Sequence, residues 1–87
     1  MPAFDADPHK LRDLSKRLQA AGDELEQLRA QVIRAFQSAG WDDQEGQRFQ
    51  HSLDADLKTA QRLGQKLRSE YTKTLEQKAR ALDEYRR

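Results

Sequence analysis

The first forty residues carry apolar side chains in a regular rhythm of three and four positions. The series is Leu11, Leu14, Leu18, Ala21, Leu25, Leu28, Val32, Ala35 and Ala39. This alternation keeps one face of an α-helix apolar over four heptads, as in helices that pack side by side. Asp7 can cap a helix that begins at Pro8. Proline is tolerated at the first helical position because the backbone N–H there has no partner within the helix. Gly40 suits the left-handed residue that ends a helix, so we predict a helix over residues 8–39.

A second, looser apolar series fills the rest of the chain, and no proline interrupts it. Its positions are Phe49, Leu53, Leu57, Ala60, Gly64, Leu67, Tyr71, Leu75 and Leu82. Asp42 and Glu45 have the three-residue spacing of a capping box, which marks the start of a helix. The sequence therefore predicts a turn over residues 40–43, containing the only tryptophan, Trp41, and one helix over about 44–86.

Two long helices joined by so short a turn predict an all-α fold in which the helices form an antiparallel hairpin. We expect this hairpin to be a single domain over residues 1–87. One hairpin has a single thin interface and leaves the apolar residues beside it uncovered. We therefore expect two hairpins to dimerise into an elongated four-helix bundle. The residues expected at the interface are Leu14, Leu18, Leu25, Leu28, Val32, Phe36, Phe49, Leu53, Leu57 and Leu67.

Charged residues make up 36% of the chain but nearly balance, with a net charge of +1. Neither half is basic enough for a nucleic-acid footprint, so we expect no nucleic-acid partner. Acids precede bases by four residues, as Asp13 precedes Arg17 and Glu76 precedes Arg80, and we expect such pairs to meet along each helix. No apolar run approaches the roughly 20 residues that span a bilayer, and the first residues lack the regions of a signal peptide.

The residue types do not favour an enzyme or a cofactor. The chain has no cysteine, and its two histidines, His9 and His51, belong to no metal-binding spacing. There is no glycine-rich phosphate loop and no nucleophile with a neighbouring base, and two slender helices offer no cleft in which carboxylates could converge. We therefore expect a protein that acts by binding alone, without a metal or a cofactor.

The residues around the turn resemble a known family. A Trp at the tip of a helical hairpin, followed by a helix with Gly46 and Phe49, resembles the WXG family of small type VII secretion proteins. This family includes the early secreted antigens of actinobacteria, and the resemblance covers essentially the whole chain in length, helix pattern and motif position. The motif Trp-x-Gly reads Trp41, Asp42 and Asp43 here, with aspartate in place of glycine.

The resemblance implies hairpins that pair antiparallel as homodimers, or as heterodimers with a related hairpin or an effector, and present the Trp turn to machinery such as a secretion ATPase. It also implies a protein that is cytoplasmic before export and is secreted without a cleaved signal peptide. Secreted members carry Tyr-x-x-x-Asp/Glu after the second helix, whereas Tyr85 is followed only by two arginines. A partner lacking the signal, a non-secreted relative and part of a longer protein all remain open. The alternative is a cytoplasmic coiled-coil adaptor or chaperone subunit unconnected with secretion.

Overall fold

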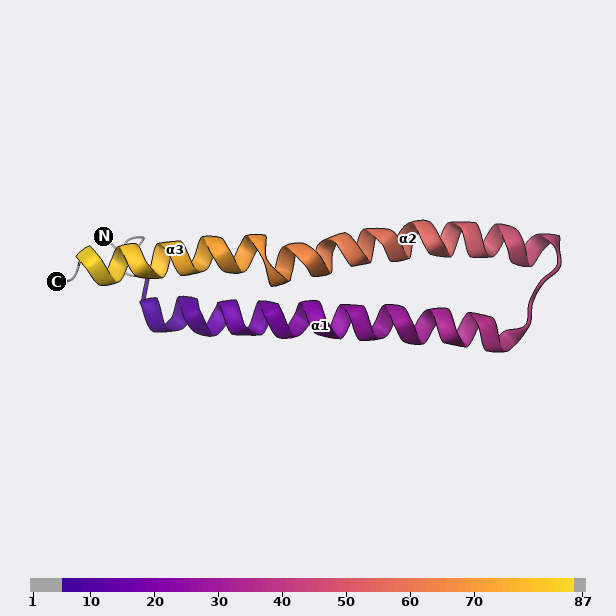
Figure 1. The fold of residues 1–87 in the computed structure, drawn as a ribbon, viewed down its shortest axis with the longest axis horizontal. Helices are drawn as coiled ribbons and strands as arrows, with labels where there is room; N and C mark the ends of the chain where they lie inside the picture. Colours follow the sequence, from indigo (N-terminus) through magenta and orange to yellow (C-terminus); the bar gives the residue numbers. More distant parts are fainter. Residues whose placement is uncertain (1–5, 86–87) are drawn as a thin grey trace.

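A computed structural model describes residues 6–85 of the chain as three consecutive helices. These are α1 (Pro8–Ala39), α2 (Gln44–Arg68) and α3 (Glu70–Tyr85). Helix α1 runs antiparallel to α2 and α3, which follow one another along a single line (Figure 1). The prediction of an all-α fold built from two long helical arms in an elongated hairpin is confirmed.

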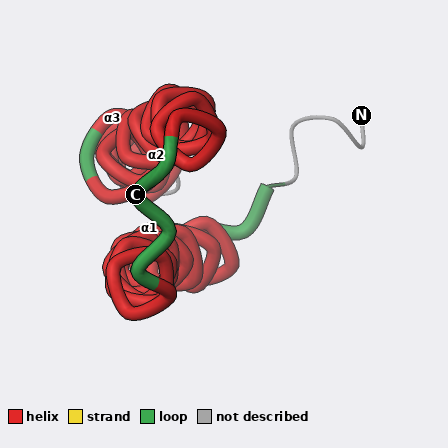
Figure 2. The backbone as a smooth tube through the Cα atoms, turned by 90° about the vertical axis from the view of Figure 1, so that its right-hand side faces the viewer, coloured by secondary structure: helices red, strands yellow, loops and turns green. Residues whose placement is uncertain are grey.

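The molecule is a thin rod. It measures 64 × 18 × 17 Å and its radius of gyration is 19.1 Å, against about 12 Å for a compact chain of this length. Viewed end-on, α1 forms one stack and α2 with α3 forms the other, and within residues 6–85 no further helix covers the contact between them (Figure 2). Each arm therefore has only one intramolecular neighbour.

The ends of α1 are those expected from the sequence. The Asp7 carboxylate accepts a hydrogen bond from the backbone N–H of His9 at 2.9 Å, and Pro8 is the first helical residue. At the other end Gly40 is left-handed, with φ 64° and ψ 26°, and its N–H donates to the carbonyl of Gln37 at 3.2 Å. Both caps satisfy backbone groups that a helix terminus leaves without partners.

The start of α2 differs from the expected capping box by one residue. Asp43, not Asp42, is the N-cap, and its carboxylate accepts from the N–H of Gly46 at 2.8 Å. After α1 ends, Gly40, Trp41 and Asp42 connect the two arms. Asp43 is therefore the residue that directly precedes α2 and caps it. Asp42 is exposed beside the turn.

The expected single helix over 44–86 was wrong, because the second arm breaks at Ser69, between α2 and α3. Ser69 has φ −126° and ψ −66°, and its hydroxyl donates to the carbonyl of Gln65 at 2.7 Å. The hydroxyl of Thr72 donates to the carbonyls of Arg68 and Ser69, both at 3.0 Å. Hydroxyls that bond back into a helix in this way bend it. The expected last residue of the helix, at position 86, lies outside the described residues.

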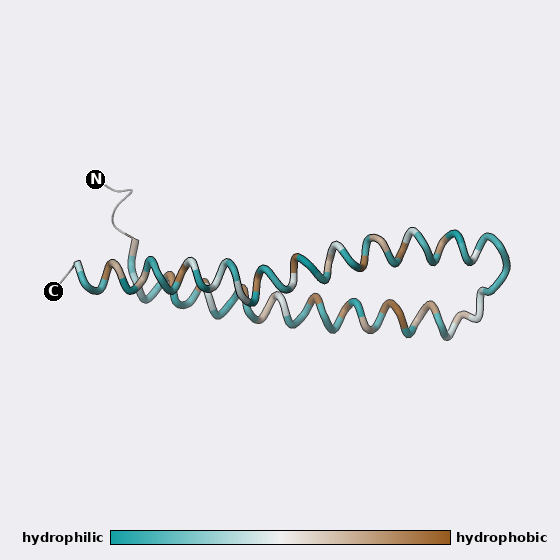
Figure 3. Tube along the Cα trace, turned by 45° about the horizontal axis from the view of Figure 1, so that its top comes forward, coloured by the Kyte–Doolittle hydropathy of each residue, from teal (hydrophilic) through white to brown (hydrophobic). Residues whose placement is uncertain are grey.

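The two arms meet along a line of small residues, which we call the small-residue line. On α1 it comprises buried positions at every seventh residue, and its partners on α2 and α3 are also small. The line consists of Pro8, Ser15 and Gly22 on α1 and of Gly64, Thr72 and Ala79 on the second arm. Apart from Pro8, Ala79 is the only buried apolar side chain in residues 6–85. Apolar residues recur along the length of both arms (Figure 3).

The closest approach lies at Gly22 and Gly64. A Cβ added to Gly22 would lie 2.8 Å from the carbonyl oxygen of Gly64 and 2.6 Å from Cγ of Arg68. Only glycine fits at such a distance without shifting the facing backbone, so Gly22 marks the place where the two helices cross most closely. The break at Ser69 follows soon after, where eight residues instead of seven separate the buried Gly64 and Thr72. The break absorbs this extra residue and keeps the line facing α1.

Candidate functional site

One side of the hairpin is held by ion pairs between the arms. The guanidinium of Arg12 lies 2.6 Å from the carboxylate of Asp83 and 4.0 Å from that of Glu76, and Arg68 lies 3.6 Å from Asp23. We call this side, marked by these five residues, the polar flank. The hydrogen bond that Arg12 donates to the carboxylate of Asp83, reinforced by the negative charge of that carboxylate, raises the pKa of Arg12, so the guanidinium stays charged at every physiological pH.

Two side chains expected to pair along their own helices have other partners among the described residues. Arg17 bonds to Glu24 at 3.1 Å instead of to Asp13, and Glu76 lies next to Arg12 of the other arm instead of pairing with Arg80. Long side chains near the small-residue line reach across it, because the arms approach closely there. Ion pairs therefore form both between the two arms and within α1.

The opposite side carries large apolar side chains that nothing in the hairpin covers. We call this side the apolar flank; it is marked by Leu14, Leu28, Val32, Leu63 and Tyr71, which are between 39% and 55% exposed. Leu14 and Leu63 each precede a buried small residue by one position. In contrast, Arg12 and Arg68 each follow one by four positions. These offsets lie on opposite sides of a helix, and corresponding sides face each other in an antiparallel pair. The hairpin therefore has one polar and one apolar flank.

The residues expected at the dimer interface fall into two groups. Half-buried against the other arm are Leu18, Leu25, Phe36, Leu53, Leu57 and Leu67. Exposed on the hairpin are Leu14, Leu28, Val32 and Phe49. The regular leucine series of α1 thus runs beside the small-residue line, with Leu18 and Leu25 half-buried and Leu14 and Leu28 exposed.

An aromatic cluster closes the turn end of the rod. Phe36 of α1 stacks on Phe49 of α2 with ring centroids 5.8 Å apart, and Trp41 lies 5.4 Å from Phe49 at an angle of 41°. Gly46 is buried beneath Trp41, since a Cβ there would lie 2.6 Å from the carbonyl oxygen of Trp41 and 3.0 Å from its Cδ1. Trp41 nevertheless stays 41% exposed. It both locks the turn and offers an accessible surface.

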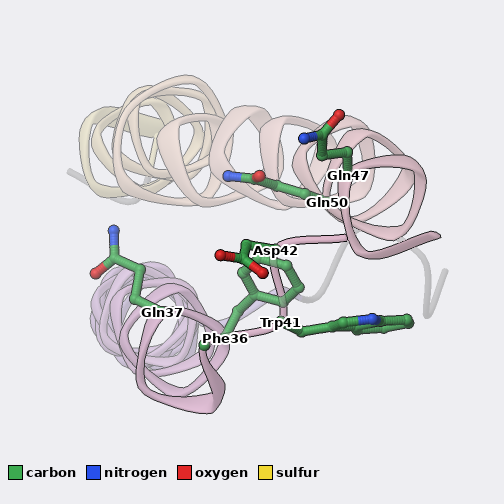
Figure 4. Close-up of a pocket in the computed structure, with 7 residues that line it drawn as sticks. Phe36, Gln37, Trp41, Asp42, Gln47 and Gln50 are labelled. Atoms are coloured by element: carbon green, nitrogen blue, oxygen red, sulfur yellow. The ribbon is translucent and has the colours of Figure 1, made fainter. Parts of the chain in front are cut away.

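Two shallow hollows adjoin this cluster. The first, of about 280 Å³, is lined by Phe36, Gln37, Gly40, Trp41, Asp42, Gln47 and Gln50. The second, of about 290 Å³, is lined by Gln47, Gln50, His51 and Asp54. In Figure 4 the Asp42 carboxylate lies between the two arms, with Gln37 on the α1 side and Gln47 and Gln50 on the α2 side. The two hollows share Gln47 and Gln50, so they form one continuous surface, which we call the turn groove.

Within residues 6–85 no group of three His, Cys, Asp or Glu side chains is placed to hold a metal ion. None of the described helices has the length and apolar character to cross a membrane. The sequence did not single out the small-residue line, the polar flank or the turn groove. The seven-residue spacing of Pro8, Ser15 and Gly22 is the signal in the sequence that could have indicated the line.

The comparisons with known proteins add no relative to this picture. No family model matches the chain, and the searches of curated proteins and of solved structures give no match either.

Proposed function

We propose that this chain is a non-enzymatic interaction protein that pairs, through its apolar flank, with a second helical hairpin to form a four-helix bundle. The bundle is of the kind that the WXG-type resemblance implies, and its turn end is offered to secretion machinery or to an effector. The turn residues assigned to this role are Trp41, Asp42 and Asp43. The competing function, a cytoplasmic coiled-coil adaptor or chaperone subunit, would use the same flank without any role in export.

The observation that carries the proposal is the uncovered apolar flank on a hairpin that buries almost no apolar side chain of its own. The chain exposes 6942 Å², whereas a compact monomer of 10.1 kDa exposes about 5,300 Å². A standard protein interface buries about 800 Å² on each partner, so one such contact would remove half of the excess. Exposed leucines and tyrosines along one side are the usual mark of a surface that another protein covers.

The test is the mass of the purified chain by light scattering, with circular dichroism alongside. We expect a helical species of twice the chain mass. Leu28→Glu should lower the mass to that of one chain. Leu28 is 55% exposed in the hairpin, so its replacement should destabilise the hairpin little, whereas in the bundle the new carboxylate would be buried. Gln27→Glu adds the same charge one position away, on the outer face of α1, and should leave the dimer intact.

A wild-type chain that stays a stable, fully helical monomer at about 100 µM would contradict the pairing. Leu28 is a better position for this test than Leu25. The Cβ of Leu25 lies within van der Waals reach of Gly64, at 3.8 Å from a Cβ added there, so a charge at Leu25 would damage the hairpin itself.

The export role is tested separately, by expressing the chain in a bacterium that has a type VII secretion system. Export that depends on the secretion ATPase and is lost in Trp41→Ala, while the variant's mass and helicity are retained, would support the WXG-type role. Retention of the wild-type chain in the cell, with its dimer intact, would favour the adaptor.

A further inference from the structure

The turn groove lies on the polar flank, away from the surface proposed for pairing. At 3.6 residues per turn, Gln50 and Asp54, which precede Gly64 by 14 and 10 residues, lie on the same side of α2 as Arg68, which follows Gly64 by four. The groove and the ion pairs therefore share one side of the second arm, and the apolar flank lies on the other. A second hairpin seated on the apolar flank would leave the turn groove open to solvent.

The groove combines three kinds of chemical group. Phe36 supplies an aromatic face, held in position by its stacking on Phe49. Side-chain amides from both arms supply hydrogen-bond donors and acceptors, of the kind that can bind the backbone of an extended peptide. They are Gln37, Gln47 and Gln50. The third group is carboxylate, supplied by Asp42 in the first hollow and by Asp54 in the second.

The charge of the turn end indicates the sign of the occupant. Residues 30–56, the parts of both arms that lie level with the groove, include five acids and two bases, Arg34 and Arg48, a net charge of −3 in a chain whose total is +1. The acids are Asp42, Asp43, Glu45, Asp54 and Asp56. Such a surface repels nucleic acid and acidic peptides and attracts basic ones. A guanidinium or ammonium group also binds favourably to an aromatic face, particularly with a carboxylate nearby.

The length of the groove indicates the size of the occupant. From Gln44, where α2 begins, to Asp54 the helix rises about 15 Å, and Asp42 lies just before it. An extended peptide covers about 3.3 Å per residue, so five or six residues span the groove from one carboxylate to the other.

We propose that the turn groove binds an extended basic peptide segment of five or six residues from another protein. One Lys or Arg side chain lies against Phe36 and Asp42, and a second reaches Asp54. The amides of Gln47 and Gln50 bind the backbone between them. This inference deepens the role proposed for the turn but does not require the hairpins to pair, since the two surfaces lie on opposite flanks.

Trp41 makes the binding directly measurable, because it lines the first hollow and is the only tryptophan. The probe is a capped hexapeptide, Arg-Ala-Leu-Ala-Ser-Arg, titrated against the full chain while Trp41 fluorescence is recorded, with calorimetry as a second readout. The control peptide carries Glu in place of both arginines. We expect saturable binding of the basic peptide alone, weakening as NaCl is raised from about 50 to 500 mM because the attraction is screened.

Two matched variants locate the site. Asp42→Asn should weaken binding about three- to tenfold, the range expected for one partly exposed charged contact. Asp56→Asn removes an equal charge from an exposed position that lines neither hollow and should leave the affinity unchanged. Equal weakening in both variants would overturn the proposal, since it would mean attraction to the acidic end in general. Binding of the acidic peptide, or no saturable binding at all, would also overturn it.

Light scattering on the same samples keeps the two proposals separate. A dimer that fails to bind the peptide refutes the groove and leaves the pairing standing. A monomer that binds the peptide, and binds it about three- to tenfold more weakly in Asp42→Asn but not in Asp56→Asn, refutes the pairing and supports the groove.

Discussion

Replacing Gly22 by alanine tests the closest contact between the arms. In the interior of an isolated helix this change stabilises by about 1 kcal/mol, because alanine has the higher helix propensity. In the hairpin the new methyl carbon would lie 2.8 Å from the carbonyl oxygen of Gly64 and 2.6 Å from Cγ of Arg68. The Arg68 side chain can move, but the oxygen belongs to the facing backbone. Overpacking of this kind costs about 1–3 kcal/mol, so we expect Gly22→Ala to lower the free energy of unfolding by about 1 kcal/mol.

Gly64→Ala is the matched control on the other arm. A Cβ at Gly64 would lie 3.4 Å from the carbonyl oxygen of Gly22, a tight contact that a shift of a few tenths of an ångström relieves. The gain in helix propensity should then outweigh the cost, and we expect this variant to be as stable as the wild type or more stable by up to about 1 kcal/mol.

The assay is thermal unfolding followed by circular dichroism at one fixed chain concentration, because association would shift the midpoint with concentration. For a chain of this size 1 kcal/mol corresponds to about 4–8 °C in Tm. A Gly22→Ala variant that gains as much as Gly64→Ala would refute the reasoning, since it would show that the carbonyl of Gly64 does not approach Gly22.

Three further substitutions test local features. Ser15→Ala should stabilise the hairpin by about 1 kcal/mol in denaturant unfolding, because the Ser15 hydroxyl is 1% exposed and has no hydrogen-bond partner. Asp43→Ala should lower the free energy of unfolding by about 1 kcal/mol, because it removes the cap of α2. Asp42→Ala should change the free energy of unfolding little, and equal effects of the two substitutions would contradict the assignment of the cap. The hydrogen bond from Arg29 lowers the pKa of Glu26, so ionised Glu26 stabilises the fold above its ordinary pKa, and this contribution disappears as the pH falls through the lowered value. Glu26→Gln should therefore flatten the fall in Tm between about pH 6 and pH 3.

The sequence was sufficient where structure is decided by neighbouring residues. The start of α1 at Pro8 and its end at Gly40 depend on backbone geometry and on a cap within a few positions, and both were predicted. The hairpin follows from the shortness of the turn. The one-residue difference at the start of α2 has a local cause as well, since Asp42 and Asp43 are both good caps and only the path of the chain across the turn selects between them.

The sequence was insufficient where distant residues decide. The break at Ser69 serves to keep Thr72 facing α1 after Gly64, and this requirement is set by the other arm, about fifty residues away. The ion pair between Arg12 and Asp83 joins residues 71 positions apart, whereas the helical period in a sequence relates charged residues only within about one turn. The turn groove is assembled from both arms and was missed for the same reason, although Trp41 and Asp42 were singled out.

The position of the leucines in this hairpin differs from that in a self-sufficient two-stranded coiled coil. In a self-sufficient two-stranded coiled coil, large apolar residues occupy the central contact and charged residues occupy both flanks. Here the central contact is made by residues such as Gly22, Gly64 and Ala79, and the ion pairs between the arms lie on one flank. Small residues bring the two backbones close together, so Leu28 on one arm and Leu63 on the other contribute to one continuous apolar surface. On this ground we propose that the hairpin is one half of a four-helix bundle, since a second hairpin seated on this surface would contact both arms at once.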